Sequence, residues 1–141
     1  MKERGYGYTG YARFGVADYT YRPLVDVEIA SEKKSRKFKA LVDSGTEITV
    51  MDQQIATLLG IEREGRSLVE LSGIEAWKPG FIAPVSLKVD GFNDTFSFNV
   101  LFIEDLRRNF EIILGQDDFF RNFVVRFEKY KNKFYLQRAP Q

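Results

Sequence analysis

Short runs in which apolar and polar residues alternate are the feature of this sequence that most constrains its fold. In residues 95–103 large apolar residues recur at every second position: Phe96, Phe98, Val100 and Phe102. Val25, Val27 and Ile29 alternate in the same way with charged residues. A period of two places apolar side chains on one face of a strand. Many such runs, with only two short helical patterns, predict a mostly β domain whose sheet is closed or folded over.

The helical patterns and turns divide these runs. Asp52 has the character of a helix N-cap, Ile55 and Leu59 follow at helical spacing, and Gly60 ends the segment. A second short helix is expected in residues 116–122. Asp90 and Gly91 predict a tight turn, and a terminal hairpin is expected around residues 131–132.

Composition excludes several kinds of chemistry. The 141 residues suggest one domain and contain neither cysteine nor histidine. Disulfides, thiolate metal sites, cysteine nucleophiles and histidine-based triads are therefore excluded. The formal net charge of +1 argues against a general nucleic-acid binder. No apolar run is long enough to span a membrane and no secretory leader is visible, so we expect a soluble, cytoplasmic protein without metal or organic cofactor.

Residues 1–22 are rich in tyrosine and glycine. Interleaved aromatic residues and glycines can stack on single-stranded nucleic acid, but this segment has few basic residues. A terminal arm or an edge strand is the simpler interpretation. We expect residues 1–22 to form an N-terminal arm and residues 23–138 to form the main domain.

An acid stands at the end of one apolar strand, where desolvation of a carboxylate is costly. The strand Ala40-Leu41-Val42 leads directly into Asp43-Ser44-Gly45-Thr46. Further along the chain, Ile112-Ile113-Leu114-Gly115 opens the second helical pattern. A carboxylate in this position requires a reason other than solubility.

Together these motifs, in this order, resemble those of the retropepsin-like aspartic proteases, the single-domain relatives of pepsin. The resemblance covers residues 24–136. It implies half of an acid-protease β-barrel with one or two short helices, assembling as a two-fold homodimer. It also implies that Asp43 is catalytic, that Ser44 hydrogen-bonds across the two-fold axis, and that Gly45 permits a tight turn. Thr46 would donate a hydrogen bond to the outer oxygen of Asp43.

The chain contains one Asp-Ser-Gly motif. Peptide hydrolysis by this route needs a general base and a general acid, which two neighbouring carboxylates supply by sharing one proton. The second carboxylate must therefore come from another copy of the chain, with a two-fold axis through the site.

The segment around Gly73 is the candidate for the flap, a hairpin that closes over bound substrate and excludes water. Gly73 would form its tip, and Ile74 and Trp77 would contact the side chains of a bound peptide. Trp77 could equally pack on the barrel. Lys78-Pro79-Gly80 departs from the glycine-rich flaps of viral members.

Glu47 occupies the position at which viral members have an aspartate that binds the substrate backbone. Its extra methylene leaves two interpretations open: a substrate-binding acid, or a solvated loop acid that pairs with a nearby arginine such as Arg121 or Arg126.

The leading hypothesis is therefore an aspartic endopeptidase that acts on peptide or protein substrates as a homodimer. The alternative is a catalytically inactive module of the same fold that dimerises or binds peptides. A third hypothesis, nucleic-acid binding through the N-terminal segment, is disfavoured by the neutral charge balance.

Overall fold

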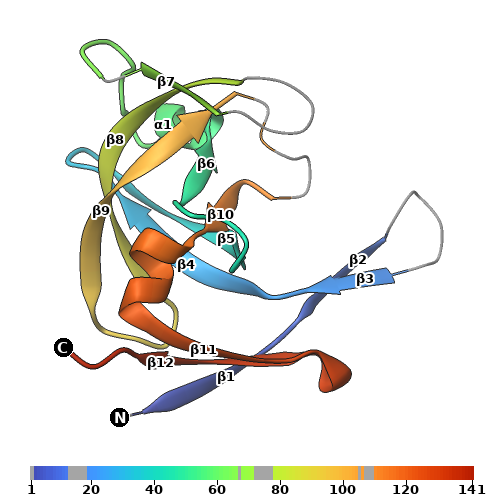
Figure 1. Ribbon diagram of the computed structural model, residues 1–141. Helices are drawn as coiled ribbons and strands as arrows, with labels where there is room; N and C mark the ends of the chain where they lie inside the picture. Colours follow the sequence, from blue (N-terminus) through green and yellow to red (C-terminus); the bar gives the residue numbers. More distant parts are fainter. Residues whose placement is uncertain (1, 13–18, 67, 72–77, 105, 107–109) are drawn as a thin grey trace.

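The computed structural model describes residues 2–12, 19–66, 68–71, 78–104, 106 and 110–141. Within these ranges the chain is mostly β-strand, arranged in three sheets with a few short helical segments (Figure 1). The prediction of a mostly β domain is confirmed.

Six strands close into a barrel. Neighbours in the largest sheet follow the order β4-β5-β10-β6-β9-β8-β7, and β8 also pairs with β4, which closes the ring. The strands of this sheet are β4 (Leu24–Ala30), β5 (Ser35–Val42), β6 (Val50–Asp52), β7 (Leu68–Leu71), β8 (Lys78–Val89), β9 (Thr95–Ile103) and β10 (Ile112–Leu114).

The alternation seen in the sequence fills the barrel interior. In β4, Val25, Val27 and Ile29 are buried in the main core. Phe81 of β8 and Phe102 of β9 stack with their ring centroids 5.3 Å apart. Burial of such side chains contributes about 1.5–3 kcal/mol each, so the core does not depend on any cross-link.

The path of the chain around β10 determines where the candidate site lies. β10 runs parallel to β5 and antiparallel to β6, and it lies between them. The chain that leaves β5 must therefore cross the end of β10 before it enters β6. That crossing segment is residues 43–49, which begins with Asp43.

The helices are short. Helix α1 (Gln53–Leu58) begins after Asp52, whose carboxylate accepts the N–H of Gln54 at 2.9 Å, and Gly60 follows its end with φ of +70°. Residues 116–122 were predicted as one short helix; the chain there begins with a π-helix, η1 (Gln116–Phe120). None of the helices in the described part of the chain is long and apolar enough to span a bilayer.

A second sheet packs below the barrel and brings the two ends of the chain together (Figure 1). It has the order β1-β12-β11, formed by β1 (Glu3–Gly7), β12 (Lys133–Arg138) and β11 (Phe123–Glu128); the 3₁₀ turn η2 (Lys129–Lys131) joins the last two.

Tyr6 of β1 stacks on Phe134 of β12 with the ring centroids 5.3 Å apart, and its hydroxyl donates to the carbonyl of Asp90 at 2.5 Å. Burial and the charge of Asp90 raise the pKa of Tyr6 to about 12.

The tyrosines and glycines of the N-terminal segment belong to paired strands. Gly5 lies opposite Tyr135, and Gly10 lies opposite Tyr21 in a separate ribbon of β2 (Thr9–Ala12) and β3 (Tyr19–Arg22). A Cβ atom on Gly5 would lie 3.0 Å from the Tyr135 ring, and one on Gly10 would lie 2.6 Å from the Tyr21 ring. Each glycine thus makes room for the aromatic ring across from it. The domain division at residue 22 stays a prediction.

Candidate active site

Asp43 lies where two parallel strands end together. Leu41 and Val42 of β5 are in register with Ile113 and Leu114 of β10. The N–H of Asp43 donates to the carbonyl of Leu114 at 3.2 Å, which fixes the first residue of the crossing segment to β10.

Two donors from the same turn hold the carboxylate of Asp43. The N–H of Gly45 donates to Oδ1 at 2.9 Å, and the hydroxyl of Thr46 donates to Oδ2 at 3.2 Å. The N–H of Thr46 also donates to the carbonyl of Asp43 at 3.3 Å, which closes the turn. A Cβ atom at position 45 would lie 3.2 Å from Oδ1, a close contact that glycine avoids. Asp43 and Thr46 are half-buried, so the acid remains accessible.

The start of the π-helix binds the carbonyl groups of the crossing segment. The N–H groups of Gln116 and Asp117 donate to the carbonyls of Thr46 and Glu47 at 2.8 and 2.7 Å. The side-chain amide of Gln116 donates to the carbonyl of Ser44 at 2.7 Å. Three hydrogen bonds from Gln116 and Asp117 therefore hold this segment against residues that are about 70 positions away in the sequence.

Gly115 is the closest point of this contact. A Cβ atom there would lie 2.6 Å from the backbone carbon of Ile48 and 2.9 Å from the carbonyl oxygen of Thr46. These are backbone atoms, which cannot turn aside as a side chain can. The Leu-Gly motif is thus explained by backbone packing against the segment that carries Asp43.

Sequence reasoning missed a buried acid in this arrangement, Asp118. Its side chain accepts the N–H of Thr49 at 3.1 Å, the hydroxyl of Thr49, and the N–H of Phe119 at 2.8 Å. The hydroxyl oxygen of Thr49 in turn accepts the N–H of Gly115 at 3.1 Å. Both Asp118 and Thr49 are buried. Asp118 therefore fixes the far end of the crossing segment, and only the doubled acid after Gly115 hinted at it.

The other predicted residues have different outcomes. Ser44 and Glu47 lie on the crossing segment and are exposed. Within the described residues Arg126 forms ion pairs with Glu3 and Glu128, and neither it nor Arg121 pairs with Glu47. Gly73, Ile74 and Trp77 lie outside the described residues. The roles assigned to all five stay predictions.

A small buried apolar cluster lies next to the acid. Leu41, Ile113 and Phe110 form a second cluster, separate from the main core, with Leu24 and Leu106 packed against it. Leu41 and Ile113 are neighbours across β5 and β10, and each lies two positions before the residue that follows its strand, Asp43 or Gly115. This cluster gives the surroundings of Asp43 an apolar character on one side.

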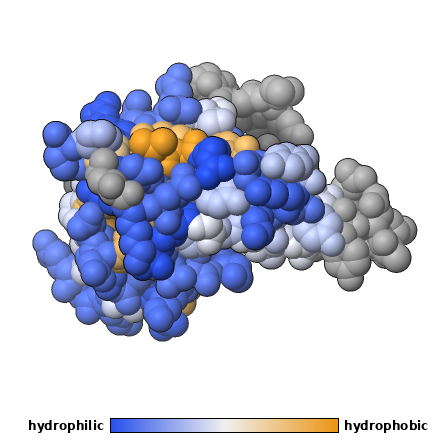
Figure 2. Space-filling model, turned by 90° about the horizontal axis from the view of Figure 1, so that it is seen from below, coloured by the Kyte–Doolittle hydropathy of each residue, from blue (hydrophilic) through white to orange (hydrophobic). Residues whose placement is uncertain are grey.

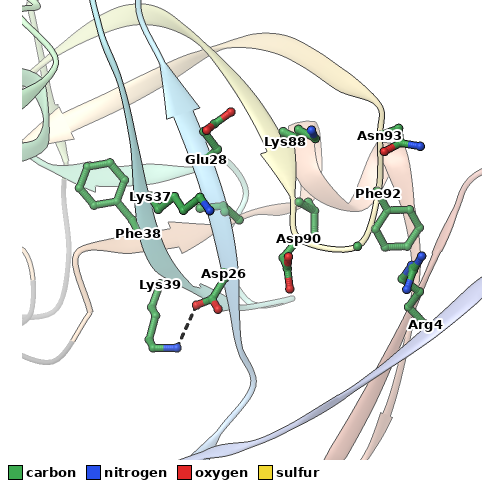
Figure 3. Close-up of a pocket in the computed structure, with 13 residues that line it drawn as sticks. Arg4, Asp26, Glu28, Lys37, Phe38, Lys39, Lys88, Asp90, Phe92 and Asn93 are labelled. Atoms are coloured by element: carbon green, nitrogen blue, oxygen red, sulfur yellow. Dashed lines mark hydrogen bonds and ion pairs between the residues drawn. The ribbon is translucent and has the colours of Figure 1, made fainter.

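A separate cavity of about 720 Å³ lies on the outside of the barrel (Figure 3). Its walls come from β4, β5, β1 and the β8–β9 turn, and none of its lining residues belongs to residues 43–49. Four cationic and three acidic side chains line it, and Lys39 pairs with Asp26 there at 2.9 Å. Its charges nearly balance, so the cavity has no strong preference for an ion of either sign. The described residues also contain no group of three or more acids that could hold a metal ion.

Comparison with solved structures matches this arrangement to known proteins. A retropepsin-like aspartic protease from Rickettsia conorii superposes with a TM-score of 0.60 at 16% identity, over 96% of this chain and 94% of that chain. The chain has the retropepsin fold. EIAV protease in complex with the inhibitor HBY-793 matches the same fold with a TM-score of 0.53 at 20% identity, over 75% of this chain and 89% of that chain. No family model and no curated protein matches the sequence.

The retropepsin fold confirms the barrel architecture expected from the sequence. Within it, the structure brings Asp43, Gly45 and Thr46 into direct contact and places Ser44 and Glu47 on the same segment. The identities of 16% and 20% establish the fold, while the chemistry must be argued from the residues themselves.

Proposed function

We propose that this chain is an aspartic endopeptidase whose active site forms between two copies. The observation that carries the proposal is the carboxylate of Asp43, held by the N–H of Gly45 and the hydroxyl of Thr46 at the accessible end of two parallel strands. An acid held by two donors in a rigid, half-buried turn has a defined position, which catalysis requires. The two solved proteins with the same fold are named as proteases.

A single carboxylate does not complete this reaction. In the proposed dimer, Asp43 and the Asp43 of a second copy share one proton across a two-fold axis. The ionised acid removes a proton from water, and the water oxygen forms a bond to the carbonyl carbon of the peptide. The protonated acid donates to the peptide oxygen. Transfer of a proton to the amide nitrogen then allows the C–N bond to break, giving a carboxylic acid and an amine.

The partly buried side chain of Leu24, which packs on the buried cluster of Leu41, Ile113 and Phe110, supports an apolar preference next to the cut bond. Leu24 is paired with Leu41, two residues before Asp43, so a peptide bound at Asp43 would lie close to it. The proposed substrate is therefore an extended peptide with apolar side chains flanking the bond that is hydrolysed.

The proposal is tested with Asp43→Asn, which keeps the size of the side chain and removes the base. We expect cleavage of a mixed peptide library to be lost between pH 3 and pH 8, with the circular dichroism spectrum and the dimer retained. Asp26→Asn is the matched control: Asp26 forms an exposed ion pair with Lys39, and such pairs contribute little. Its activity should equal that of the wild type.

Three outcomes separate the hypotheses. Full activity in Asp43→Asn would exclude the proposed mechanism. A wild-type protein that cleaves nothing but dimerises or binds peptides would support the inactive module instead. Specific activity should also fall on dilution below the dissociation constant of the dimer; a monomer with undiminished activity would rule out a shared site.

A further inference from the structure

The basic residues of this chain gather in its two terminal segments. Residues 1–22 and 121–141 contain ten of the 21 basic residues and only three of the 20 acidic ones. These segments contain the strands of the second sheet and of the β2–β3 ribbon, whereas the intervening residues, which contain the barrel, are acidic overall. The formal net charge of +1 therefore conceals a basic part, and such an asymmetry suggests a nucleic-acid or membrane partner.

All seven tyrosines lie in the same two segments. The tyrosine-rich segment at the start of the chain has few basic residues, and the basic segment at its end contains only two of the tyrosines. The pairing of β1 with β12 brings the two segments together, and the rings of Tyr6 and Tyr8 both pack on Phe134. Folding thus combines aromatic rings and positive charges that lie at opposite ends of the sequence.

The rings and charges meet where η2 joins β11 to β12. The N–H of Tyr8 donates to the carbonyl of Asn132 at 2.8 Å, and the amine of Lys129 donates to the carbonyl of Tyr21 at 3.1 Å. The same amine lies 5.1 Å from the centroid of the Tyr8 ring. Figure 1 shows η2 at the end of the second sheet, on the side of the molecule from which the ribbon projects. The end of the sheet and the base of the ribbon therefore form one continuous surface.

Three cations of this region have no acidic partner. The described acids of the two terminal segments, Glu3 and Glu128, already form ion pairs with Arg126 and Lys131. Within the described residues, no ion pair involves three further exposed side chains: Arg22, Lys129 and Lys133. Their charges can therefore bind the negative groups of a ligand.

These cations are neighbours around Tyr8. Burial raises the pKa of Tyr8, and the charge of Arg22 acts on the same hydroxyl in the opposite direction, so Arg22 lies close to it. Lys133 lies directly opposite Gly7, the residue before Tyr8. Together with Lys129 beside the Tyr8 ring, the three positive charges lie within a short stretch of surface.

Tyr130 is the most exposed large hydrophobic side chain of the described residues, at 83%. It lies in η2 between Lys129 and Lys131. Tyr21 and Phe127 are also exposed, so three of the five exposed large hydrophobic side chains in the described part of the chain are at this end. Aromatic rings beside cations offer stacking to bases and charge to phosphates, the combination found on surfaces that bind single strands.

We infer that this surface binds single-stranded nucleic acid. We call it the η2 surface and define it by six side chains: Tyr8, Tyr21, Arg22, Lys129, Tyr130 and Lys133. Tyr130 stacks on an unpaired base, and the cations contact phosphates on the same strand. The bases of a duplex are already stacked on one another, so the surface favours single strands. The inference does not rest on the proposed function, because none of these residues contacts the segment that carries Asp43.

Two alternatives fit the structure less well. A membrane-binding surface buries an apolar face, whereas Figure 2, a view from below, shows hydrophilic residues over most of this side of the molecule. The β4–β5 hairpin also contains five basic residues between positions 33 and 39. There, however, Lys39 pairs with Asp26, Lys37 lies opposite Glu28, and no large hydrophobic side chain is exposed.

Fluorescence anisotropy with labelled strands of about 16 nucleotides tests the inference on the full chain. RNA and DNA strands of the same mixed sequence are compared with the corresponding DNA duplex at several NaCl concentrations. We expect at least one kind of strand to bind about tenfold more tightly than the duplex, and the tighter of the two identifies the ligand as RNA or DNA. For three phosphate contacts, the logarithm of the binding constant should fall against the logarithm of the salt concentration with a slope of about −2.

Substitutions separate stacking from charge. Tyr130→Ala should raise Kd about tenfold, whereas Tyr130→Phe keeps the ring and should leave Kd within about twofold of the wild type. Lys133→Gln should raise Kd and reduce the salt slope by about 0.7. Lys34→Gln removes an equal charge from the exposed β4–β5 turn and is the matched control, which should change neither quantity. Because Tyr130 is so exposed, its variants should unfold in urea at the wild-type midpoint.

The outcomes also separate this inference from the proposed function. Absence of oligonucleotide binding at about 50 mM NaCl would overturn the η2 surface and leave the peptidase proposal intact. Binding that is unchanged in Tyr130→Ala, or weakened as much by Lys34→Gln as by Lys133→Gln, would indicate diffuse attraction between charges and overturn it. Tighter binding to vesicles of anionic lipid or to polyglutamate than to either strand would assign the surface to a membrane or an acidic protein and would overturn it as well.

Discussion

Substitution of Asp118 by asparagine tests how the segment carrying Asp43 is held. The Oδ1 atom of Asp118 accepts the hydroxyl of Thr49 and the N–H of Phe119, and Oδ2 accepts the N–H of Thr49. All three partners are donors. An asparagine that keeps its oxygen at the position of Oδ1 points its amide hydrogens at the N–H of Thr49, so two donors face each other in a buried site.

The size of the effect follows from these contacts. Leaving the buried N–H of Thr49 without an acceptor costs about 1–3 kcal/mol. The two remaining bonds lose their charged acceptor, at about 1 kcal/mol each. Because the contacts are coupled, we expect a total loss of about 3 kcal/mol in the free energy of unfolding. A domain of this size has about 5–15 kcal/mol in all, so the variant should still fold.

The assay is urea unfolding followed by tryptophan fluorescence, together with peptidase kinetics at a temperature where both proteins are folded. With an m-value of about 2 kcal/mol/M, the midpoint should fall by about 1.5 M. Since Asp118 fixes the end of the segment that begins with Asp43, kcat should also fall at least tenfold, with little change in KM.

Thr49→Val is the control that identifies the mechanism. It removes the hydroxyl shared by Asp118 and Gly115. In a double-mutant cycle the two changes should cost less together than separately, by about 0.5–3 kcal/mol. A midpoint for Asp118→Asn within 0.3 M of the wild type, with kcat unchanged, would refute the assigned role of Asp118.

Three further changes probe other contacts. Gly115→Ala places a Cβ atom against backbone atoms of the crossing segment. We therefore expect the free energy of unfolding to fall by about 1–3 kcal/mol and kcat to fall more than tenfold; an unchanged kcat would contradict this expectation. Thr46→Ala removes the hydroxyl that holds Oδ2 of Asp43, so we expect kcat/KM to fall at least tenfold with the fold retained. A wild-type kcat/KM in this variant would show that the hydroxyl does not position the acid. Burial and the charge of Asp90 raise the pKa of Tyr6 to about 12, so the folded state keeps a proton that the unfolded state loses near pH 10. The contribution of Tyr6 to stability should therefore be constant below about pH 10 and fall by about 1 kcal/mol between pH 10 and 12, after allowance for solvent screening of a half-buried group. Tyr6→Phe should flatten this part of the stability curve in urea titrations, and an equal slope in the variant would exclude Tyr6 as the titrating group.

Features set by local sequence were predicted well. The strand β9 has the predicted bounds, Thr95–Ile103, because its alternation leaves one face for the core. Asp52 caps helix α1 as expected, and Gly91 adopts φ of +92° in the predicted turn. In the candidate site, Asp43 and Gly45 were found because a turn motif is contiguous in sequence.

Features that depend on distant pairing were not predicted. The hydrogen bond between Thr49 and Asp118 joins residues 69 positions apart, and neither a threonine nor an aspartate indicates in the sequence which distant residue it will bind. The π-helix that positions Asp118 has no periodicity that distinguishes it from a short α-helix. The pairing of β1 with β12 was also out of reach, because the alternation of a strand defines its faces and not its neighbours.

That last pairing has a consequence for how the molecule folds. Glu3 lies opposite Gln137, so β1 cannot find its partner until nearly the whole sequence has been synthesised. Closing so long a loop costs entropy before any contact repays it, and such pairings slow folding. We therefore expect the barrel to form first and the sheet containing β1 to be completed last. The β2–β3 ribbon follows β1 directly, so it reaches its final orientation at the same late step.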